Sequence, residues 1–246
     1  MNNRNHTYHG YRFPPEIISH SVWLYHRFCL SFRDVEDLLA ERGIIVSYET
    51  IRSWCNKFGP AYARSIKKRR GSLGDTWYTD EVYIVTVRGE RLYLWRAVDQ
   101  ESLPHKRSEC CGYGDVLDIL VQKLKDKQSA VRFFKKLMKG QGCSARKIVT
   151  DKLPSYGPAR KEIMPTSMHC HERYANNRAE VSHEHTRAQE RQMRRFKSPG
   201  QAQRFLAVHS QVHNLFHIGR HLLRAANYRL LRSRSFETWQ QVTCAC

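Results

Sequence analysis

Three acidic residues from distant parts of the chain have the type and setting to bind metal ions. Asp80 lies in the middle of a predicted β-strand with apolar neighbours. Asp151 directly follows the apolar run Ile148–Thr150, and Glu180 lies on a predicted helix. A carboxylate among apolar side chains is costly unless a cation or a hydrogen-bond donor meets it. Three carboxylates can hold two Mg²⁺ ions, which prefer oxygen ligands and leave positions for water and phosphate.

The spacing of the acids alone leaves alternatives open. An aspartate isolated in a strand is more often hydrogen-bonded than catalytic. Asp99, after the apolar strand Leu92–Val98, and Asp118, in another predicted strand, have similar local settings. The pattern by itself therefore favours no single set of acids.

The elements that carry these acids predict a mixed sheet. From Trp77 the hydrophobic pattern has a period of two, which indicates strands, and later segments have a helical period. Three successive strands followed by helix, strand and helices differ from a doubly wound sheet, which alternates from its start. We therefore expect an α/β fold with helices on the faces of a mixed sheet. The predicted strands are 77–87, 91–98, 116–122 and 148–150, and the first predicted helices after them are 129–139 and 158–163.

The N-terminal third is predicted to be helical. Ser31 begins a capping box for a second helix, and Ser47 can cap a third, which ends at Phe58. Helix, glycine-bearing turn and helix form a helix-turn-helix, whose last helix would offer side chains to a DNA major groove. A three-helix bundle that contacts other proteins is the alternative. The side chains that would face DNA include Tyr48, Arg52 and Asn56.

Charge indicates a polyanionic partner. The 246 residues include 42 Lys and Arg against 23 acids, a net charge of +19, and such a surplus commonly matches nucleic acid. From Arg187 to Arg234 there are 11 basic residues and one acid, which suits salt-sensitive binding to duplex phosphates. Without a long apolar run or a secretion signal, a cytoplasmic protein with no membrane partner is expected. The eight cysteines include no C-x-x-C pair, which disfavours structural zinc.

Several segments resemble, in order, the catalytic blocks of the DDE transposases of the IS-six family of bacterial insertion sequences. The likeness runs from about Tyr11 to the C-terminus. The matching segments are Arg12–Ile18, Trp77–Tyr83 with Leu92–Asp99, Val149–Tyr156, Asn176–Arg187 and Arg195–Phe205. The resemblance implies an RNase H-like core of the retroviral-integrase type, with Asp80, Asp151 and Glu180 as the catalytic and metal-binding triad.

The resemblance also implies partners and a cofactor. We expect two Mg²⁺ ions per site, with Mn²⁺ as a plausible substitute, and double-stranded DNA at element ends and target. A homodimer or higher oligomer on DNA is expected because transposases act on paired ends. Glu180 and Arg187 are seven residues apart, so both should project from one helix face. The residues expected to contact DNA are Arg187, Lys152, Asn177, Arg191, Arg195 and Lys197.

These patterns predict five segments along the chain. They are an arm (1–14), a helix-turn-helix domain (15–63), a basic linker (64–74), a catalytic domain (75–220) and a helical tail (221–246). Two features depart from the family pattern: Ser102–Tyr113 looks like an insertion, and Cys170 stands where relatives tend to carry arginine. Three alternatives remain, namely an inactive transposase, a helix-turn-helix repressor, and a nuclease that cuts without joining.

Overall fold

The chain contains two compact units. The computed structural model describes residues 7–70, 74–100, 114–172, 175–219 and 223–244. One unit comprises Met1–Arg70 with Ala207–Cys246, and the other comprises Gly71–Leu206. Helix α8 (Pro199–Phe216) contributes residues to both. The predicted insertion Ser102–Tyr113 lies outside the described residues.

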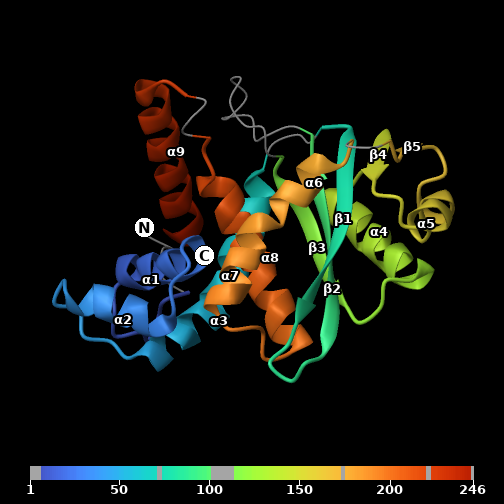
Figure 1. Cartoon of the computed structure of the whole chain (residues 1–246). Coiled ribbons are helices and arrows are strands. Elements are labelled where there is room, and N and C mark those ends of the chain that lie inside the picture. Colours follow the sequence, from blue (N-terminus) through green and yellow to red (C-terminus); the bar gives the residue numbers. More distant parts are fainter. Residues whose placement is uncertain (1–6, 71–73, 101–113, 173–174, 220–222, 245–246) are drawn as a thin grey trace. The chain divides into compact units, whose positions relative to one another are not determined.

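The unit Gly71–Leu206 is built on a five-stranded sheet with the order β3-β2-β1-β4-β5 (Figure 1). Strands β1, β2 and β3 pair antiparallel, whereas β4 pairs parallel with β1 and β5 parallel with β4. The first four strands confirm the predicted ones. The fifth was missed because three residues are too few to display a period of two. The strands are β1 (Thr76–Val85), β2 (Arg91–Asp99), β3 (Val116–Gln122), β4 (Lys147–Thr150) and β5 (Met168–Cys170).

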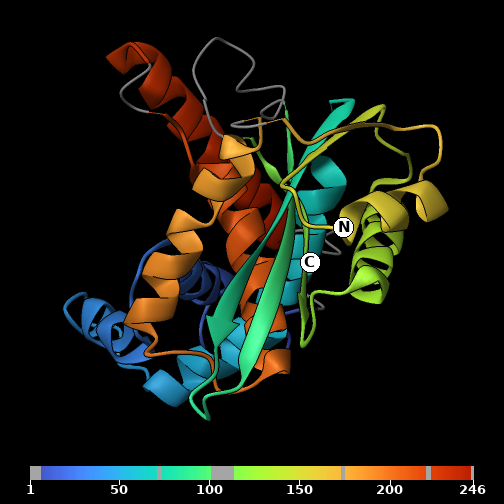
Figure 2. The same ribbon diagram turned by 45° about the vertical axis from the view of Figure 1, so that its right-hand side comes forward.

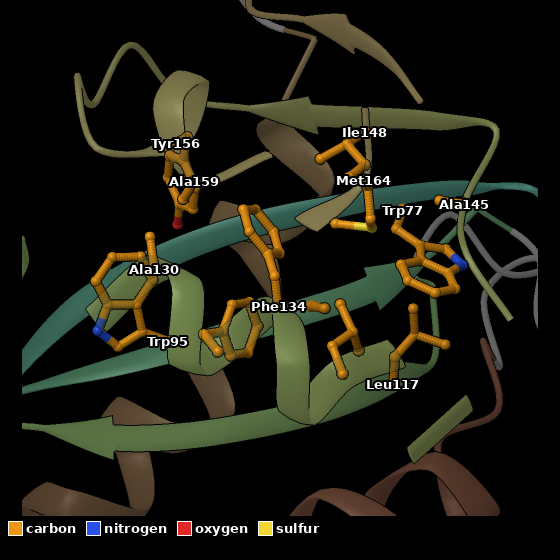
Figure 3. Packing of buried hydrophobic residues seen from close by; sticks show 13 residues of the cluster. Trp77, Trp95, Leu117, Ala130, Phe134, Ala145, Ile148, Tyr156, Ala159 and Met164 are labelled. Carbon is orange, nitrogen blue, oxygen red and sulfur yellow. The ribbon is translucent and has the colours of Figure 1, made fainter. Parts of the chain in front are cut away.

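Helices cover both faces of this sheet, which confirms the predicted RNase H-like core. Helices α4 (Lys127–Gln141) and α5 (Tyr156–Ile163) lie on one face, and α6 (Asn177–Ser182) and α7 (Glu184–Gln192) lie on the other (Figures 1 and 2). Large side chains fill the space between the sheet and α4–α5 (Figure 3), and each contributes about 1.5–3 kcal/mol on burial. The largest of them, all fully buried, are Trp77, Trp95, Phe133, Phe134 and Tyr156.

One edge of β1 is covered by a segment that is not a strand. β4 pairs with β1 from Thr76 to Thr79, and β1 continues beyond that point to Val85. Backbone groups on a sheet edge need partners. The segment that carries α6 and α7 supplies them at both of its ends. Asn176 Nδ2 donates to Thr79 O at 3.0 Å, Val85 N to Glu190 Oε1 at 3.0 Å, and Val87 N to Phe196 O at 2.8 Å.

The other unit is helical and contains the predicted helix-turn-helix elements. Ser31 and Asp34 form both hydrogen bonds of the predicted capping box, and Ser47 Oγ accepts from Thr50 N at 3.4 Å. The packed face of the third helix includes Ile51 and Trp54, as predicted. The helices of this unit are α1 (Pro15–Arg27), α2 (Phe32–Ala40), α3 (Tyr48–Arg69) and α9 (Ala225–Cys244), with the second half of α8.

Helix α3 is longer than predicted, because Gly59 and Pro60 do not end it. The apolar spacing continues through Tyr62 and Ile66, which are buried, and tertiary packing outweighs the hydrogen bond that proline removes. A side chain at Gly59 would lie 3.3 Å from His26 Nε2, so glycine permits close packing here. The prediction of a linker from residue 64 is therefore wrong as far as Arg69.

The predicted arm and tail are both packed into the helical unit. Tyr8 is 6% exposed, and its hydroxyl donates to Thr243 O at 2.8 Å. In the predicted tail, the ring of Trp239 meets that of Tyr62 on α3 edge to face, with centroids 5.4 Å apart. The borders at residues 14 and 220 were predicted from local sequence pattern. That pattern does not show these aromatic contacts, because they join segments far apart in sequence. Across the described ranges, no helix has both the length and the apolarity to cross a membrane.

Candidate active site

The pairing of β1 with β4 brings Asp80 beside Asp151. The last paired residues are Thr79 and Thr150, so the residue that follows each of them is one of the two acids. Side chains at matching positions of parallel strands point to the same side. Asp151 Oδ1 accepts a hydrogen bond from Leu153 N at 3.1 Å, which holds the carboxylate where β4 ends. Carboxyl ends of strands are common places for sites in sheet proteins.

A third carboxylate, Glu81, joins these two. The carboxylate oxygens of Asp80, Glu81 and Asp151 lie within 4.8 Å of one another, a spacing that suits a shared divalent cation. The Glu81 side chain is 4% exposed, accepts a hydrogen bond from Tyr156 Oη at 2.9 Å and lies 3.9 Å from Lys125 Nζ. Sequence analysis missed Glu81, because consecutive strand residues are expected on opposite faces.

Glu180 approaches this cluster from the helical segment. It is an exposed residue on α6, and among the described residues it does not belong to the group whose oxygens meet within 4.8 Å. Its negative charge nevertheless contributes to the raised pKa of Asp151. The structure therefore brings two predicted acids together and places the third within electrostatic reach.

The crowding of acids disfavours their charged forms. Burial, together with the charges of Asp151 and Asp80, raises the pKa of Glu81 to about 7, and the hydrogen bond from Tyr156 opposes this shift. Burial also raises the pKa of Asp151. A bound cation would favour the charged forms of these groups. The all-oxygen donor set therefore fits a hard divalent ion.

Two basic side chains, those of His183 and Arg96, lie close to Asp80. His183 Nε2 is 3.3 Å from Asp80 Oδ2, and burial lowers the pKa of His183 to about 4, so the ring is neutral near pH 7. Arg96 is opposite Asp80 in the β1–β2 pairing and is 2% exposed. Burial lowers the pKa of Arg96 to about 10, with the charge of Asp80 opposing the shift, so it stays charged. A charged residue inside the apolar run Leu92–Val98 was the sequence signal that could have identified Arg96.

The expectation that Glu180 and Arg187 share the face of one helix is wrong. α6 ends at Ser182, α7 begins at Glu184, and His183 lies between the two helices. Buried His183 and the contacts of the segment with the sheet interrupt the regular helix. Arg187 is exposed, and its guanidinium lies 5.7 Å from the centre of the Tyr83 ring.

The other residues predicted to contact DNA have accessible positions in their own units. Arg194 and Arg195 both have left-handed backbone conformations, with φ of 51° at Arg194 and 77° at Arg195. In the helical unit, Arg52 is half-buried and lies 3.0 Å from Glu49 Oε1, so part of its charge is already balanced. Tyr48 is half-buried and Asn56 is exposed. The exposed candidates in the sheet unit are Lys152, Asn177, Arg191, Arg195 and Lys197. Their roles remain predictions.

Replacing Glu81 by glutamine should change how stability depends on pH. The folded pKa of about 7 exceeds the ordinary value of 4.5, so the folded protein binds an extra proton between these values. Stability contributed by Glu81 is therefore lost as pH rises from about 4.5 to 7. In metal-free buffer, Glu81→Gln should exceed the wild-type free energy of unfolding by about 2 kcal/mol at pH 8, with little difference at pH 5. Urea unfolding at both pH values measures this, and parallel pH profiles would contradict it.

A mixed sheet with acids side by side where the pairing of two parallel strands ends is the arrangement of a DDE-type phosphoryl-transfer enzyme. Residues 74–218 match a family model described as a DDE domain. The transposase of the insertion sequence-like element IS431mec of Staphylococcus aureus is 32% identical over 179 residues, which cover 71% of this chain and 74% of the relative. The transposase of IS257 in transposon Tn4003, also from Staphylococcus aureus, matches to the same extent. This chain belongs to the IS-six (IS6) family of DDE transposases, as the sequence motifs predicted.

A solved structure is also similar. The Mos1 transposase catalytic domain, in a structure with raltegravir and Mg, is 15% identical, with a TM-score of 0.41 over 76% of this chain and 94% of that one. Membership in the DDE family implies dependence on a divalent metal.

Proposed function

We propose that this transposase cuts the ends of an insertion sequence and joins them to target DNA, with Asp80, Asp151 and Glu180 as its catalytic and metal-binding residues. One observation carries the proposal: the carboxylate oxygens of Asp80 and Asp151, 71 positions apart in sequence, lie within 4.8 Å of each other where the pairing of the parallel strands β1 and β4 ends. The raised pKa values of Glu81 and Asp151 add support, since such crowding favours a bound cation.

The proposed cofactor is Mg²⁺, two ions per site, with Mn²⁺ as a substitute. When bound, the ions activate the attacking oxygen and stabilise the leaving oxygen of the phosphodiester. Asp80 and Asp151 would hold them from the sheet, and Glu180 would do so from α6. A water molecule would first attack the phosphodiester and free a 3′-hydroxyl, which would then attack target DNA in line. Lys152, exposed beside Asp151, would contact the phosphate. No covalent enzyme intermediate is required.

The proposed DNA contacts divide between the two units. Phosphates of the duplex would bind the exposed basic side chains around α7, with an affinity that falls steeply with salt. The terminal repeats would be read by α3, with Tyr48, Arg52 and Asn56 facing a major groove. The protein would act as a homodimer or higher oligomer, because two element ends are joined together. Its proposed location is the bacterial cytoplasm. The side chains proposed to bind phosphate are Arg187, Arg191, Arg195, Lys197 and Asn177.

A strand-transfer assay tests this proposal. Purified protein is mixed with labelled DNA from the two flanks of its coding sequence, a target plasmid and Mg²⁺. Joined products are expected with Mg²⁺ or Mn²⁺, and none with a chelator. Free 3′-hydroxyl ends that are never joined would instead indicate a nuclease. Binding without cleavage would indicate a regulatory or inactive protein, and deleting Ser102–Tyr113 would show whether the insertion causes the inactivity.

A further inference from the structure

We infer that Arg96 is a positioning residue that holds α6, and with it Glu180, against the carboxylate cluster. The inference rests on the proposed role of Glu180 as a metal ligand. Arg96 extends from the interior of β2 and is 2% exposed. It lies opposite Asp80 in the β1–β2 pairing.

The guanidinium of Arg96 contacts both sides of the junction between α6 and α7. Nη1 donates to Ser182 O, the carbonyl of the last residue of α6, and Nη2 donates to Thr186 Oγ1 in the first turn of α7. Ser182 Oγ lies 3.5 Å from the same Nη1. Glu180 is two residues before Ser182, so this contact is close to the proposed metal ligand.

α6 requires such support because it is only six residues long. A helix of that length is unstable by itself, and the carbonyls of its last turn have no partners within the helix. Arg96 provides a partner at its C-terminal end. At the other end, Asn176 Nδ2 donates to Thr79 O at 3.0 Å. These two contacts attach the helix of Glu180 to β2 and to Thr79, the residue before Asp80 on β1.

Arginine suits this task better than lysine. Its planar guanidinium can donate to two acceptors in fixed directions, whereas the lysine ammonium is a point charge on a flexible stem. A lysine at position 96 would keep a positive charge opposite Asp80 and near His183. It would lose the simultaneous contacts to Ser182 and Thr186. The substitution Arg96→Lys therefore separates positioning of α6 from balancing of charge.

Direct metal binding tests the inference without relying on activity. Mn²⁺ binding to the DNA-free full-length protein is measured by calorimetry for wild type, Arg96→Lys, Glu180→Gln and the double variant. Arg96→Lys should bind Mn²⁺ about tenfold more weakly, as is usual when a group that orients a metal ligand is lost. In the Glu180→Gln background the same change should have little further effect, because the ligand that Arg96 positions is already absent.

A matched control is Arg160→Lys. Arg160 Nη1 also donates to backbone carbonyls, those of Pro165 and Ser167, in a part of the unit that carries none of the proposed ligands. This variant should bind Mn²⁺ like wild type. Amide hydrogen exchange should rise in 177–192 in Arg96→Lys and stay unchanged there in the control.

The outcomes separate the inference from the proposed function. If Glu180→Gln binds Mn²⁺ normally, Glu180 is no ligand and the proposed triad fails. If Glu180→Gln weakens binding and Arg96→Lys does not, or if the two effects add, Arg96 does not act through Glu180. Should Arg96→Lys fail to fold, Thr186→Val removes one contact with little change in volume. It should weaken Mn²⁺ binding in the same direction by a smaller factor, and unchanged binding would overturn the inference.

Discussion

Replacing Asp151 by asparagine is expected to lower the rate of strand transfer by at least ~1000-fold, because a metal ligand that supports several kcal/mol of transition-state stabilisation is lost. The fold should survive. The amide oxygen of asparagine can still accept the hydrogen bond from Leu153 N, and burial and nearby acids already disfavour the charge of Asp151. The measurements are strand transfer, DNA binding and thermal unfolding on the same preparation, with only the first expected to change.

Asp118→Asn is the matched control. Asp118 has a setting in the sequence similar to the proposed acids, and in the structure its carboxylate pairs with Lys136 and accepts from Ile119 N. Its exchange should leave the rate of strand transfer within a few-fold of wild type. A wild-type rate for Asp151→Asn would remove Asp151 from the proposed triad. Equal losses in both variants would point to damaged folding as the cause.

Replacing Trp95 by alanine is expected to lower the free energy of unfolding of the sheet unit by about 3–5 kcal/mol, the usual cost of removing a large buried aromatic side chain. Trp95 is fully buried (Figure 3). Its ring centroid lies 6.0 Å from that of Phe133 and 5.5 Å from that of Tyr156, the latter edge to face. Tyr156 also binds Glu81, so a cavity here should loosen the carboxylate cluster as well. Urea unfolding measures the loss.

Two variants serve as comparisons for the loss of stability in Trp95→Ala. Trp95→Phe keeps an aromatic ring in the cluster and should cost clearly less than the alanine exchange. Leu124→Ala removes a side chain that is 59% exposed, and should change the free energy of unfolding by no more than about 0.5 kcal/mol. A loss for Trp95→Ala as small as that for Leu124→Ala would show that this cluster does not stabilise the unit.

Sequence reasoning succeeded where local pattern determines structure. The period of two located β1 to β4, and the serines at positions 31 and 47 located the starts of two helices. It failed where distant packing decides the outcome. α3 continues through Pro60 because Tyr62 and Ile66 are buried. Tyr8 belongs to the helical unit because its hydroxyl reaches Thr243 O.

The candidate site shows the same division. Asp80 and Asp151 could be selected because motifs and strand ends mark them. The register that brings these acids side by side depends on the pairing of β1 with β4, which no local pattern contains. Glu81 was missed because consecutive strand residues are expected on opposite faces. Arg96 is conspicuous as a charge inside an apolar strand, but its acceptor, the Ser182 carbonyl, has no signature in a sequence.

The short length of β4 has a chemical consequence. β4 ends at Thr150, whereas its neighbour β1 runs on to Val85. A β4 that continued alongside would have saturated this flank of β1 with backbone hydrogen bonds, leaving no room there for a helix. Because the pairing stops early, a side chain from α6 can approach acids that belong to strands. If Glu180 is a metal ligand as proposed, truncating one strand lets ligands from a helix and from strands serve the same cation.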